Sequence, residues 1–238
     1  MSNRLKATLL LILLANILKK SPVYLLLYFL AFALLSWKEW KSLPTLMGLA
    51  VFIGFFAELA GTHLCLPFGC YEYVNLQPQL FGVALFVPLA WGIFGSVAYL
   101  TASFLFSRKV TRLLFGALLM VIFDLSIDPI MTSWEAWVWI RTTSVNWFGI
   151  PWTNYIGWFL VSLTIFYLYE RLSDPSICSC LGRFGPAIYL LEVSTFALYA
   201  PASVRTPTLI ALALSFLLLV PLTVRRLKNE GGPNPDAR

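Results

Sequence analysis

The stretch from Leu80 to Phe106, LFGVALFVPLAWGIFGSVAYLTASFLF, decides the fold class of this chain. It lies in a longer segment, residues 73–107, that contains no charged residue. A bilayer span needs roughly 20 consecutive apolar residues, so this stretch is long enough to cross a membrane. Pro88 lies inside it and predicts a kink in the helix.

The composition extends this interpretation to the whole chain of 238 residues. Charged residues make up 12% and hydrophobic residues 59%, whereas about a quarter of an average soluble domain is charged. So little charge argues against a soluble globular enzyme, a disordered chain and a disulfide scaffold. We therefore expect an all-α membrane protein, a polytopic bundle of seven to eight transmembrane helices.

Charges and prolines separate the apolar runs. The predicted helices are Ala7–Leu18 (a retained short span or an interfacial helix), Val23–Trp37, Pro44–Gly61, Leu80–Phe106, Thr111–Asp128, Trp152–Tyr169, Gly185–Ser203 and Pro207–Val224. We predict a single membrane-embedded domain over residues 1–224. The polar residues 225–238 are predicted to form a disordered cytoplasmic tail.

The Lys and Arg residues predict the orientation of the bundle. With eight spans and both termini in the cytoplasm, only four of the 17, Lys19, Lys20, Arg141 and Arg205, fall on the outer side. We therefore expect a multi-pass protein of the cell membrane with a cytoplasmic C-terminus. The basic clusters are topology determinants in this interpretation, and no nucleic-acid partner is expected.

The four cysteines and the single histidine do not form a recognisable metal site. Cys65 and Cys70 are five residues apart, and Cys178 and Cys180 are two apart. Neither pair has the spacing of a zinc finger. His63 is the only histidine available to complete a ligand set, so we expect no bound metal.

Two loops, Thr62–Gln79 and Pro129–Pro151, are long and aromatic, and both fall on the outer side in this topology. Six of the nine tryptophans lie between Trp134 and Trp158. An interfacial aromatic belt is one interpretation, but such a belt normally occupies both faces of the membrane. The excess on one face favours a lid or an aromatic-lined pocket.

Acidic residues inside spans indicate function, because a charge is costly in lipid. Asp124 and Asp128 are four residues apart and share a helix face, and Glu58 lies at the same depth in another span. Carboxylates packed in a low-dielectric site without basic neighbours cannot all ionise. At least one should hold a proton, as an acid catalyst requires. A structural alternative is that protonated acids hold the helices together. Glu192, nearer mid-membrane, has no assigned role.

Three blocks between residues 58 and 159 carry a resemblance to a known family. The first is Glu58-x-x-Gly61 with Pro67-Phe68-Gly69-x-Tyr71-x-Tyr73, Phe81-Gly82-Val83 and Val87-Pro88-Leu89-x-Trp91; the second is Asp124-x-x-x-Asp128-Pro129 with Trp137-x-Trp139; the third is Phe148-Gly149-Ile150-Pro151-x-x-Asn154-x-x-Gly157-Trp158-Phe159. In order and spacing these blocks resemble the carotenoid-biosynthesis membrane proteins, which include CruF-type carotenoid 1,2-hydratases and bisanhydrobacterioruberin hydratase.

The resemblance implies a cofactor-independent hydration of the terminal isoprenoid C=C bond of an acyclic carotenoid. A carboxylic acid would protonate the less substituted carbon, and water would add to the resulting tertiary carbocation. A carboxylate and aromatic faces would stabilise that cation. The expected partners are the acyclic carotenoid, water and the lipid bilayer, with other membrane enzymes of the carotenoid pathway as candidates.

The same resemblance and the chemistry of the side chains suggest roles for individual residues. Asp124 or Asp128 is the expected proton donor, with the other as its ionised partner. Glu58 is expected to position water or to stabilise the cation. The expected substrate-binding residues are Tyr71, Tyr73, Trp91, Trp137, Trp139, Asn154 and Trp158, of which Tyr71 and Asn154 would orient groups by hydrogen bonding.

Two other classes of function remain open on the sequence alone. A carotenoid cyclase or prenyl-adding enzyme would use similar carbocation chemistry. The D-x-x-x-D spacing of Asp124 and Asp128 is typical of a prenyltransferase, but Pro129 follows and no basic residue flanks the pair. A non-catalytic carotenoid- or lipid-binding protein, or a transporter, would use the acids structurally or as a proton relay.

Overall fold

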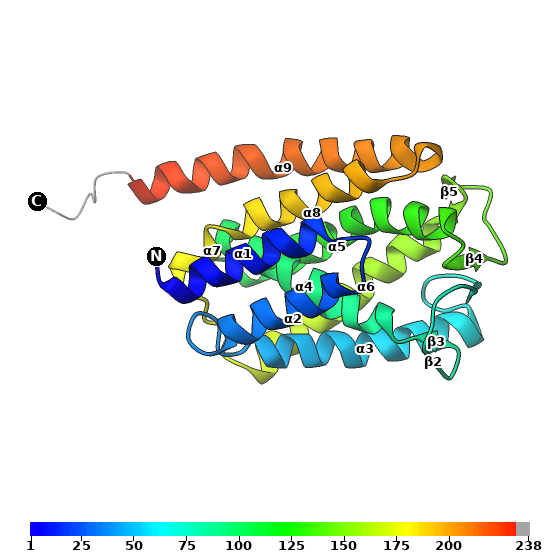
Figure 1. Cartoon of the computed structure of the whole chain (residues 1–238), viewed down its shortest axis with the longest axis horizontal. Coiled ribbons are helices and arrows are strands. Elements are labelled where there is room, and N and C mark those ends of the chain that lie inside the picture. The colour runs from blue at the N-terminus through cyan, green and yellow to red at the C-terminus, as the bar shows by residue number, and fades with distance from the viewer. Residues whose placement is uncertain (232–238) are drawn as a thin grey trace, which may run out of the picture.

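Eight long helices run lengthwise through the structure, a computed structural model that describes residues 1–231 (Figure 1). They are α1 (Asn3–Ile17), α2 (Val23–Ser36), α3 (Leu43–Leu64), α4 (Phe86–Leu105), α5 (Lys109–Ser133), α6 (Trp152–Leu172), α8 (Gly185–Tyr199) and α9 (Arg205–Gly231). The short α7 (Ser179–Gly182) precedes α8, and a 3-10 turn, η1 (Ala202–Val204), precedes α9. The prediction of an all-α fold is confirmed.

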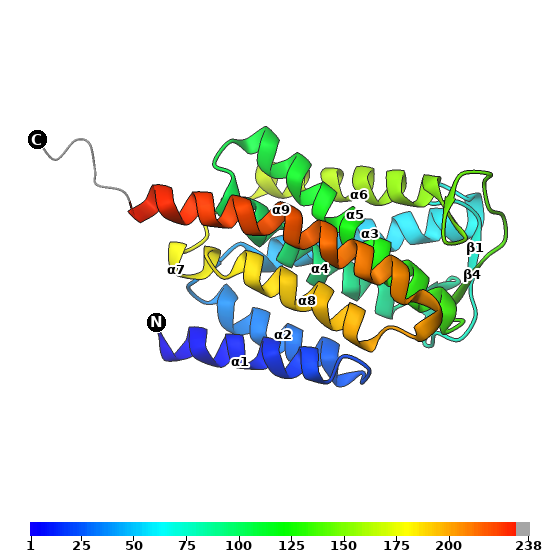
Figure 2. The ribbon, with the colours of Figure 1, turned by 90° about the horizontal axis from the view of Figure 1, so that it is seen from above.

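Short strands gather at one end of the bundle, and α1 begins and α9 ends at the opposite end (Figures 1 and 2). The strands are β1 (Tyr71–Tyr73), β2 (Gln79–Leu80), β3 (Val83–Ala84), β4 (Trp137–Trp139), β5 (Asn146–Trp147) and β6 (Ile150–Pro151). They form three antiparallel pairs, β1–β4, β2–β3 and β5–β6. The two long loops predicted from the sequence therefore meet at a single end of the molecule.

The core of the bundle is built around α4, in which 16 of 20 residues are buried. Small residues on this helix, such as Gly92, Gly95 and Ala98, let neighbouring helices approach closely, as is typical of membrane bundles. The outer faces of α3 and α9 instead expose large apolar side chains, including Phe52 and Leu217. Exposed apolar helix faces match a lipid environment, and the protein is a membrane protein.

The expected number of seven to eight spans is not supported. Within the described residues, four helices are long and apolar enough to cross a membrane: α3, α4, α5 and the segment Ala202–Glu230 that contains α9. The helices α1, α2 and α8 have only 15, 14 and 15 residues, whereas a span needs about 20. The periodic apolar runs predicted helices correctly but overestimated how many of them span.

The central helix begins later than predicted. The sequence placed its start at Leu80, but β2 and β3 occupy residues 79–84 and α4 begins at Phe86. Phe81 and Gly82, both at positive φ (52° and 78°), form the two-residue turn that joins these strands, as in a type I′ hairpin. Pro88 is consequently in the first turn of α4, where proline is tolerated, so the predicted kink is wrong.

Two predicted helix ends are also wrong. Asp128 was predicted to end its helix before Pro129, but α5 continues through that proline to Ser133. A membrane helix tolerates the lost hydrogen bond because its neighbours re-satisfy the freed carbonyl. Residues 225–231 of the predicted tail belong to α9, where Arg226 pairs with Glu230 at 3.4 Å, one turn later. The rest of the tail, 232–238, lies outside the described residues.

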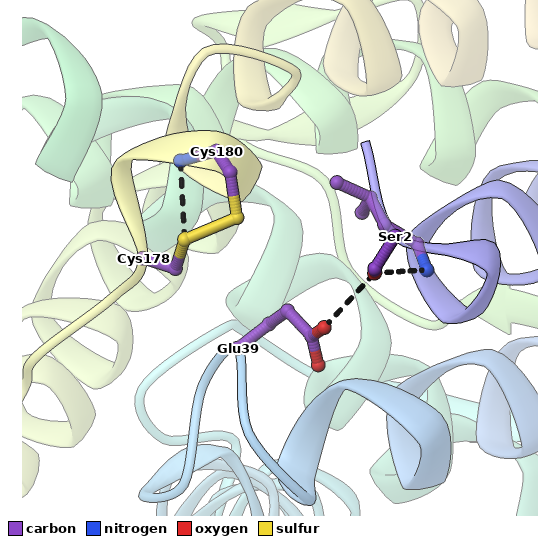
Figure 3. The surroundings of a disulfide bond; sticks show 5 residues. Ser2, Glu39, Cys178 and Cys180 are labelled. Carbon is purple, nitrogen blue, oxygen red and sulfur yellow. Dashed lines mark hydrogen bonds between the residues drawn. A yellow bond between two sulfur atoms is a disulfide. The ribbon is translucent and has the colours of Figure 1, made fainter.

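All four cysteines form disulfides, and the two bonds lie at opposite ends of the bundle. Cys65–Cys70 joins the end of α3 to the loop that leads into β1. The Cys178–Cys180 bond lies at the opposite end of the bundle, where α1 begins, beside Glu39 and Ser2 (Figure 3). There the carbonyl of Glu39 accepts a hydrogen bond from the Cys178 amide at 2.9 Å, and its carboxylate accepts one from Ser2 Oγ at 3.3 Å.

Candidate active site

One pair of strands, β1 and β4, covers the strand end of the bundle and is called the lid below. Tyr71 lies opposite Trp139 and Tyr73 lies opposite Trp137. Because side chains alternate between the two faces of a strand, these four aromatic residues share one face of the lid. Glu72, on the other face, is exposed. The lid therefore presents an aromatic surface to the helices that it covers.

The carboxylate of Glu58, buried near the end of α3, meets this aromatic face. Its Oε2 accepts hydrogen bonds from the hydroxyls of Tyr71 and, at 2.6 Å, Tyr73. Its Oε1 accepts one from Nε1 of Trp91 on α4, at 2.9 Å. Three donors to one carboxylate compensate for much of its lost hydration and favour the ionised form.

Asp124 and Asp128 lie one turn apart on α5 and are joined by Asn154 of α6. The side-chain nitrogen of Asn154 donates to Asp124 Oδ2 at 2.5 Å and to Asp128 Oδ2 at 2.7 Å. Asn154 does not cap α6, whose N-cap residue, Pro151, makes no side-chain capping bond. The amide thus holds the two carboxyl groups in a fixed relation to each other.

The two aspartates differ in their remaining oxygen atoms. Asp128 Oδ1 accepts hydrogen bonds from Trp137 Nε1 at 2.7 Å, from Trp139 Nε1 at 3.2 Å and from Thr132 Oγ1 at 3.4 Å. Asp124 Oδ1 is buried and has no hydrogen-bond partner among residues 1–231. Asp128 is therefore surrounded by donors that favour its ionised form, and Asp124 is not.

A pocket of about 30 Å³ lies between the lid and the helices, and all three acids line it. All of the predicted site residues except Trp91 line this pocket. The residues that line it are Glu58, Phe68, Tyr71, Tyr73, Val87, Asp124, Asp128, Trp137, Trp139, Asn154 and Trp158. Phe68 and Val87 were not predicted as site residues, although both lie in the sequence blocks quoted above. We call this cavity the acid pocket.

Aromatic rings of Phe68 and Trp158 form one wall of the acid pocket, and Trp91 packs behind them. The rings of Trp91 and Trp158 lie face to face, 4.1 Å apart between centroids, and Phe68 lies 6.1 Å from Trp91. The π faces of such rings attract a cation placed over them, most strongly in a site without water. The wall therefore complements positive charge that develops in the pocket.

The two lid tyrosines remain neutral donors. Burial raises the pKa of the Tyr71 hydroxyl well above its usual range, and the nearby carboxylate of Glu58 raises it further. The same two causes raise the pKa of Tyr73. Both hydroxyls keep their protons at any physiological pH and so act as hydrogen-bond donors to Glu58.

Two glycines allow the lid and the loop that precedes β1 to approach the helices this closely. A Cβ atom on Gly61 of α3 would lie 2.6 Å from the hydroxyl oxygen of Tyr71, and one on Gly157 of α6 would lie 2.7 Å from the ring of Phe68. Real Cβ atoms do not come so near, so any larger residue would move the lid. The glycines of the Glu58-x-x-Gly61 and Asn154-x-x-Gly157 blocks thus fix the depth of the acid pocket.

The fourth acid, Glu192, belongs to a separate cluster. It is fully buried on α8, where its Oε2 lies 2.6 Å from Lys19 Nζ and its Oε1 accepts a hydrogen bond from Asn16 Nδ2 at 2.7 Å. Tyr24 and Tyr28 also donate to this carboxylate. Lys19, predicted as an outer-loop topology marker, is instead its buried ionic partner.

His63 takes no part in either cluster. It is exposed at the end of α3, where its ring nitrogen lies within hydrogen-bond distance of Thr62 Oγ1 and the carbonyl of Leu59. Within the described chain, no group of three or more His, Cys, Asp or Glu side chains is arranged to hold a metal ion.

Comparison with known proteins agrees with the resemblance noted in the sequence. The model of the family described as "Carotenoid biosynthesis protein" matches residues 20–222. This range includes both lid strands and every residue of the acid pocket. No curated protein and no solved structure matches the chain. Because the family model covers most of its length, the chain belongs to the carotenoid biosynthesis protein family.

Proposed function

We propose that the protein is a carotenoid 1,2-hydratase, a hydro-lyase that adds water to the terminal isoprenoid C=C bond of an acyclic carotenoid without a cofactor. One observation carries the proposal: Asp124, whose Oδ1 has no hydrogen-bond partner among residues 1–231, lines an aromatic pocket together with two other, well hydrogen-bonded carboxyl groups. Membership of the carotenoid biosynthesis family supports the choice of substrate class.

The unequal hydrogen bonding determines which of the three acids are ionised and which one is protonated. Glu58 and Asp128 each accept several N–H or O–H donors and are ionised in this proposal. Three carboxylates so close together in a low-dielectric site would repel one another, so one must hold a proton. Asp124, which has the fewest donors, is that acid.

The reaction then proceeds in two steps. The π electrons of the alkene take the proton from Asp124 onto the less substituted carbon, which leaves a carboxylate on Asp124 and a tertiary carbocation on the substrate. A water molecule uses a lone pair to form the C–O bond. Its surplus proton returns to the carboxylate of Asp124, so the acid is regenerated and a tertiary alcohol is the product.

The surroundings of the acids stabilise the charge that forms between these steps. The carbocation lies near the carboxylates of Glu58 and Asp128, and the rings of Phe68 and Trp158 border it. Electrostatic groups that are already oriented lower the barrier because nothing has to rearrange as the charge develops. Asn154 keeps Asp124 in position throughout.

We also propose the location and orientation of the molecule. The end of the bundle where α1 begins and α9 ends is rich in basic residues, for example Arg4, Arg183 and Arg225. Basic residues are enriched on the cytoplasmic side of membrane proteins. We propose a multi-pass protein of the cell membrane with its C-terminus in the cytoplasm, so that water reaches the lid from the outer interface.

Co-expression with a lycopene-producing pathway tests the proposed reaction. Hydration adds the mass of one water molecule to each modified end of the pigment. A product of unchanged mass with a different retention time would instead indicate the cyclase alternative. Pigment that is bound by the protein but left unaltered would contradict both enzymes and favour a non-catalytic binding protein.

A further inference from the structure

A second, larger cavity lies beside the acid pocket and is called the apolar pocket below. It has a volume of about 80 Å³, against about 30 Å³ for the acid pocket. Its walls come from α4, α5, α8 and the turn between α1 and α2, and residues such as Ala90, Phe94, Ile127 and Phe196 make them apolar. A cavity of this kind suits an uncharged hydrocarbon.

The two cavities share a wall. Val87, Trp137 and Trp158 line both of them. Trp91 lines the apolar pocket, while its Nε1 donates to Glu58 of the acid pocket. A ligand in the apolar pocket therefore lies against the rings that border the three acids.

The lengths of the helices explain where the apolar pocket opens. At 1.5 Å per residue, α1 and α2 with 15 and 14 residues are about 22 Å long, whereas α3 with 22 residues is about 33 Å. The turn between α1 and α2 consequently stops short of the strand end (Figures 1 and 2). The rim includes two exposed residues, Lys20 of this turn and Trp134 at the end of α5. This rim, between the α1–α2 turn and the end of α5, is on the flank of the bundle, the part that faces lipid when the helices span a membrane.

Lys19 also lines the apolar pocket, but its positive charge is neutralised there. The ammonium group of Lys19 is 2.6 Å from Glu192 Oε2, donates to Thr195 Oγ1 at 2.8 Å and lies 3.6 Å from the centroid of the Phe196 ring. Its side chain is only 6% exposed. The Glu192 cluster thus neutralises Lys19 and holds the α1–α2 turn against α8, which keeps the cavity apolar and its side opening in place.

We propose that the apolar pocket binds the hydrocarbon chain of the substrate, an extended uncharged polyisoprenoid that enters sideways from the bilayer. Its terminal alkene passes the rings of Trp137 and Trp158 to reach the acids, and the rest of the chain stays in the apolar pocket and the lipid. This assignment rests on the proposed function for the identity of the chain, but the binding itself needs no reaction.

Binding of lycopene to the full-length protein in lipid nanodiscs tests the assignment. The Asp124→Asn variant serves as the background, so that no turnover occurs, and quenching of tryptophan fluorescence by the polyene reports binding. In this background Ala90→Phe fills the pocket and should raise the Kd about tenfold or more, equivalent to roughly 1.4 kcal/mol. Leu89→Phe, the matched control, adds the same ring on a different face of α4, in a groove on the outer surface, and should leave the Kd unchanged.

Equal affinities of the two variants would overturn the assignment. A photoreactive benzophenone side chain at Phe94 gives a second measurement that does not depend on how well Ala90→Phe folds. It should form a covalent adduct with lycopene, whereas the same group at Leu89 should label phospholipid. Phospholipid adducts alone at Phe94 would also contradict the proposal. If lycopene binds as described but the unmodified protein forms no alcohol, the assignment of the apolar pocket as a binding site is retained and the proposed reaction is wrong.

Discussion

At the scale of single residues, Asp124 and Asp128 differ in the hydrogen bonding of one carboxylate oxygen. Asp128 has donors on both carboxylate oxygens, and Asp124 has one oxygen without a partner in the described chain. The sequence predicted that one aspartate of the pair donates the proton, but spacing alone does not distinguish them. Hydrogen bonding depends on which side chains the lid brings to each oxygen, and only the folded structure supplies that information.

We predict that Asp124→Asn lowers the rate of hydration by about 10²–10⁴-fold, the usual contribution of a general acid. Asparagine has nearly the same shape but no acidic proton, so the protein should still fold. Product formation in membranes, at matched expression, measures the effect. Ser126→Ala is the control, because this buried hydroxyl on the same helix makes no hydrogen bond within the described residues. Full activity of Asp124→Asn would exclude this residue as the donor.

Tyr73→Phe tests the role of the lid hydroxyls. The change removes a 2.6 Å hydrogen bond to Glu58 and keeps the ring. A hydrogen bond to a charged group contributes about 1.5–3 kcal/mol, so the rate constant should fall roughly tenfold to a hundredfold. Tyr167→Phe, on an exposed part of α6, should have no effect. If the two variants have the same kcat, the Tyr73 hydroxyl does not contribute to catalysis.

At the scale of elements, the lid was the least predictable part. The sequence predicted two long aromatic loops on one face, and the structure shows that they pair as β1 and β4. The alternation in Tyr71-Glu72-Tyr73 and in Trp137-Val138-Trp139 is typical of strands, but three residues are too few to distinguish a strand from a loop. Pairing between segments more than 60 positions apart is set by the helices that bring them together.

The fit between lid and helices makes a clear prediction for two glycines of α3. Gly61→Ala should destabilise the protein by about 1–3 kcal/mol, because its methyl group would overlap Tyr71. Gly48→Ala, on the same helix, meets no atom within 4 Å and should leave stability unchanged or slightly raised. Thermal unfolding in detergent compares the two. Equal unfolding temperatures would show that the lid does not lie against Gly61.

The docking of the α1–α2 turn onto α8 depends on the Lys19–Glu192 pair. Glu192→Gln leaves the buried ammonium group without its counter-charge, and removal of one partner of a buried pair costs about 3–5 kcal/mol. The double variant Lys19→Met, Glu192→Gln removes both charges and should regain most of that stability. Unfolding temperatures of the two variants measure the difference. A double variant no more stable than Glu192→Gln would contradict the pairing.

At the scale of the whole molecule, composition predicted the class correctly, but the number of spans was overestimated. The apolar run Val23–Trp37 is already shorter in the sequence than a span needs, and α2 has 14 residues. The run Gly185–Ser203 is longer, but α8 ends at Tyr199 after 15 residues. The grouping of the three acids was more predictable than the number of spans, because the sequence already placed them at one depth, and they line one pocket.

The proposed orientation makes a prediction that does not depend on the reaction. An alkaline phosphatase fused after Arg238 should be inactive, because that enzyme requires the oxidising side of the membrane. A green fluorescent protein fused at the same position should be fluorescent. Together the two fusions give opposite results for the two orientations. An active phosphatase would place the C-terminus outside and reverse the assignment of the lid to the outer interface.

The measurement that tests the central claim most directly uses purified protein in nanodiscs with lycopene and water labelled with heavy oxygen. The account predicts that the labelled oxygen appears in a tertiary alcohol at the end of the chain, and that Asp124→Asn forms this alcohol at least about a hundredfold more slowly, while Ser126→Ala forms it at the normal rate. A product that lacks the labelled oxygen, or an Asp124→Asn variant that forms it at the normal rate, would contradict the account.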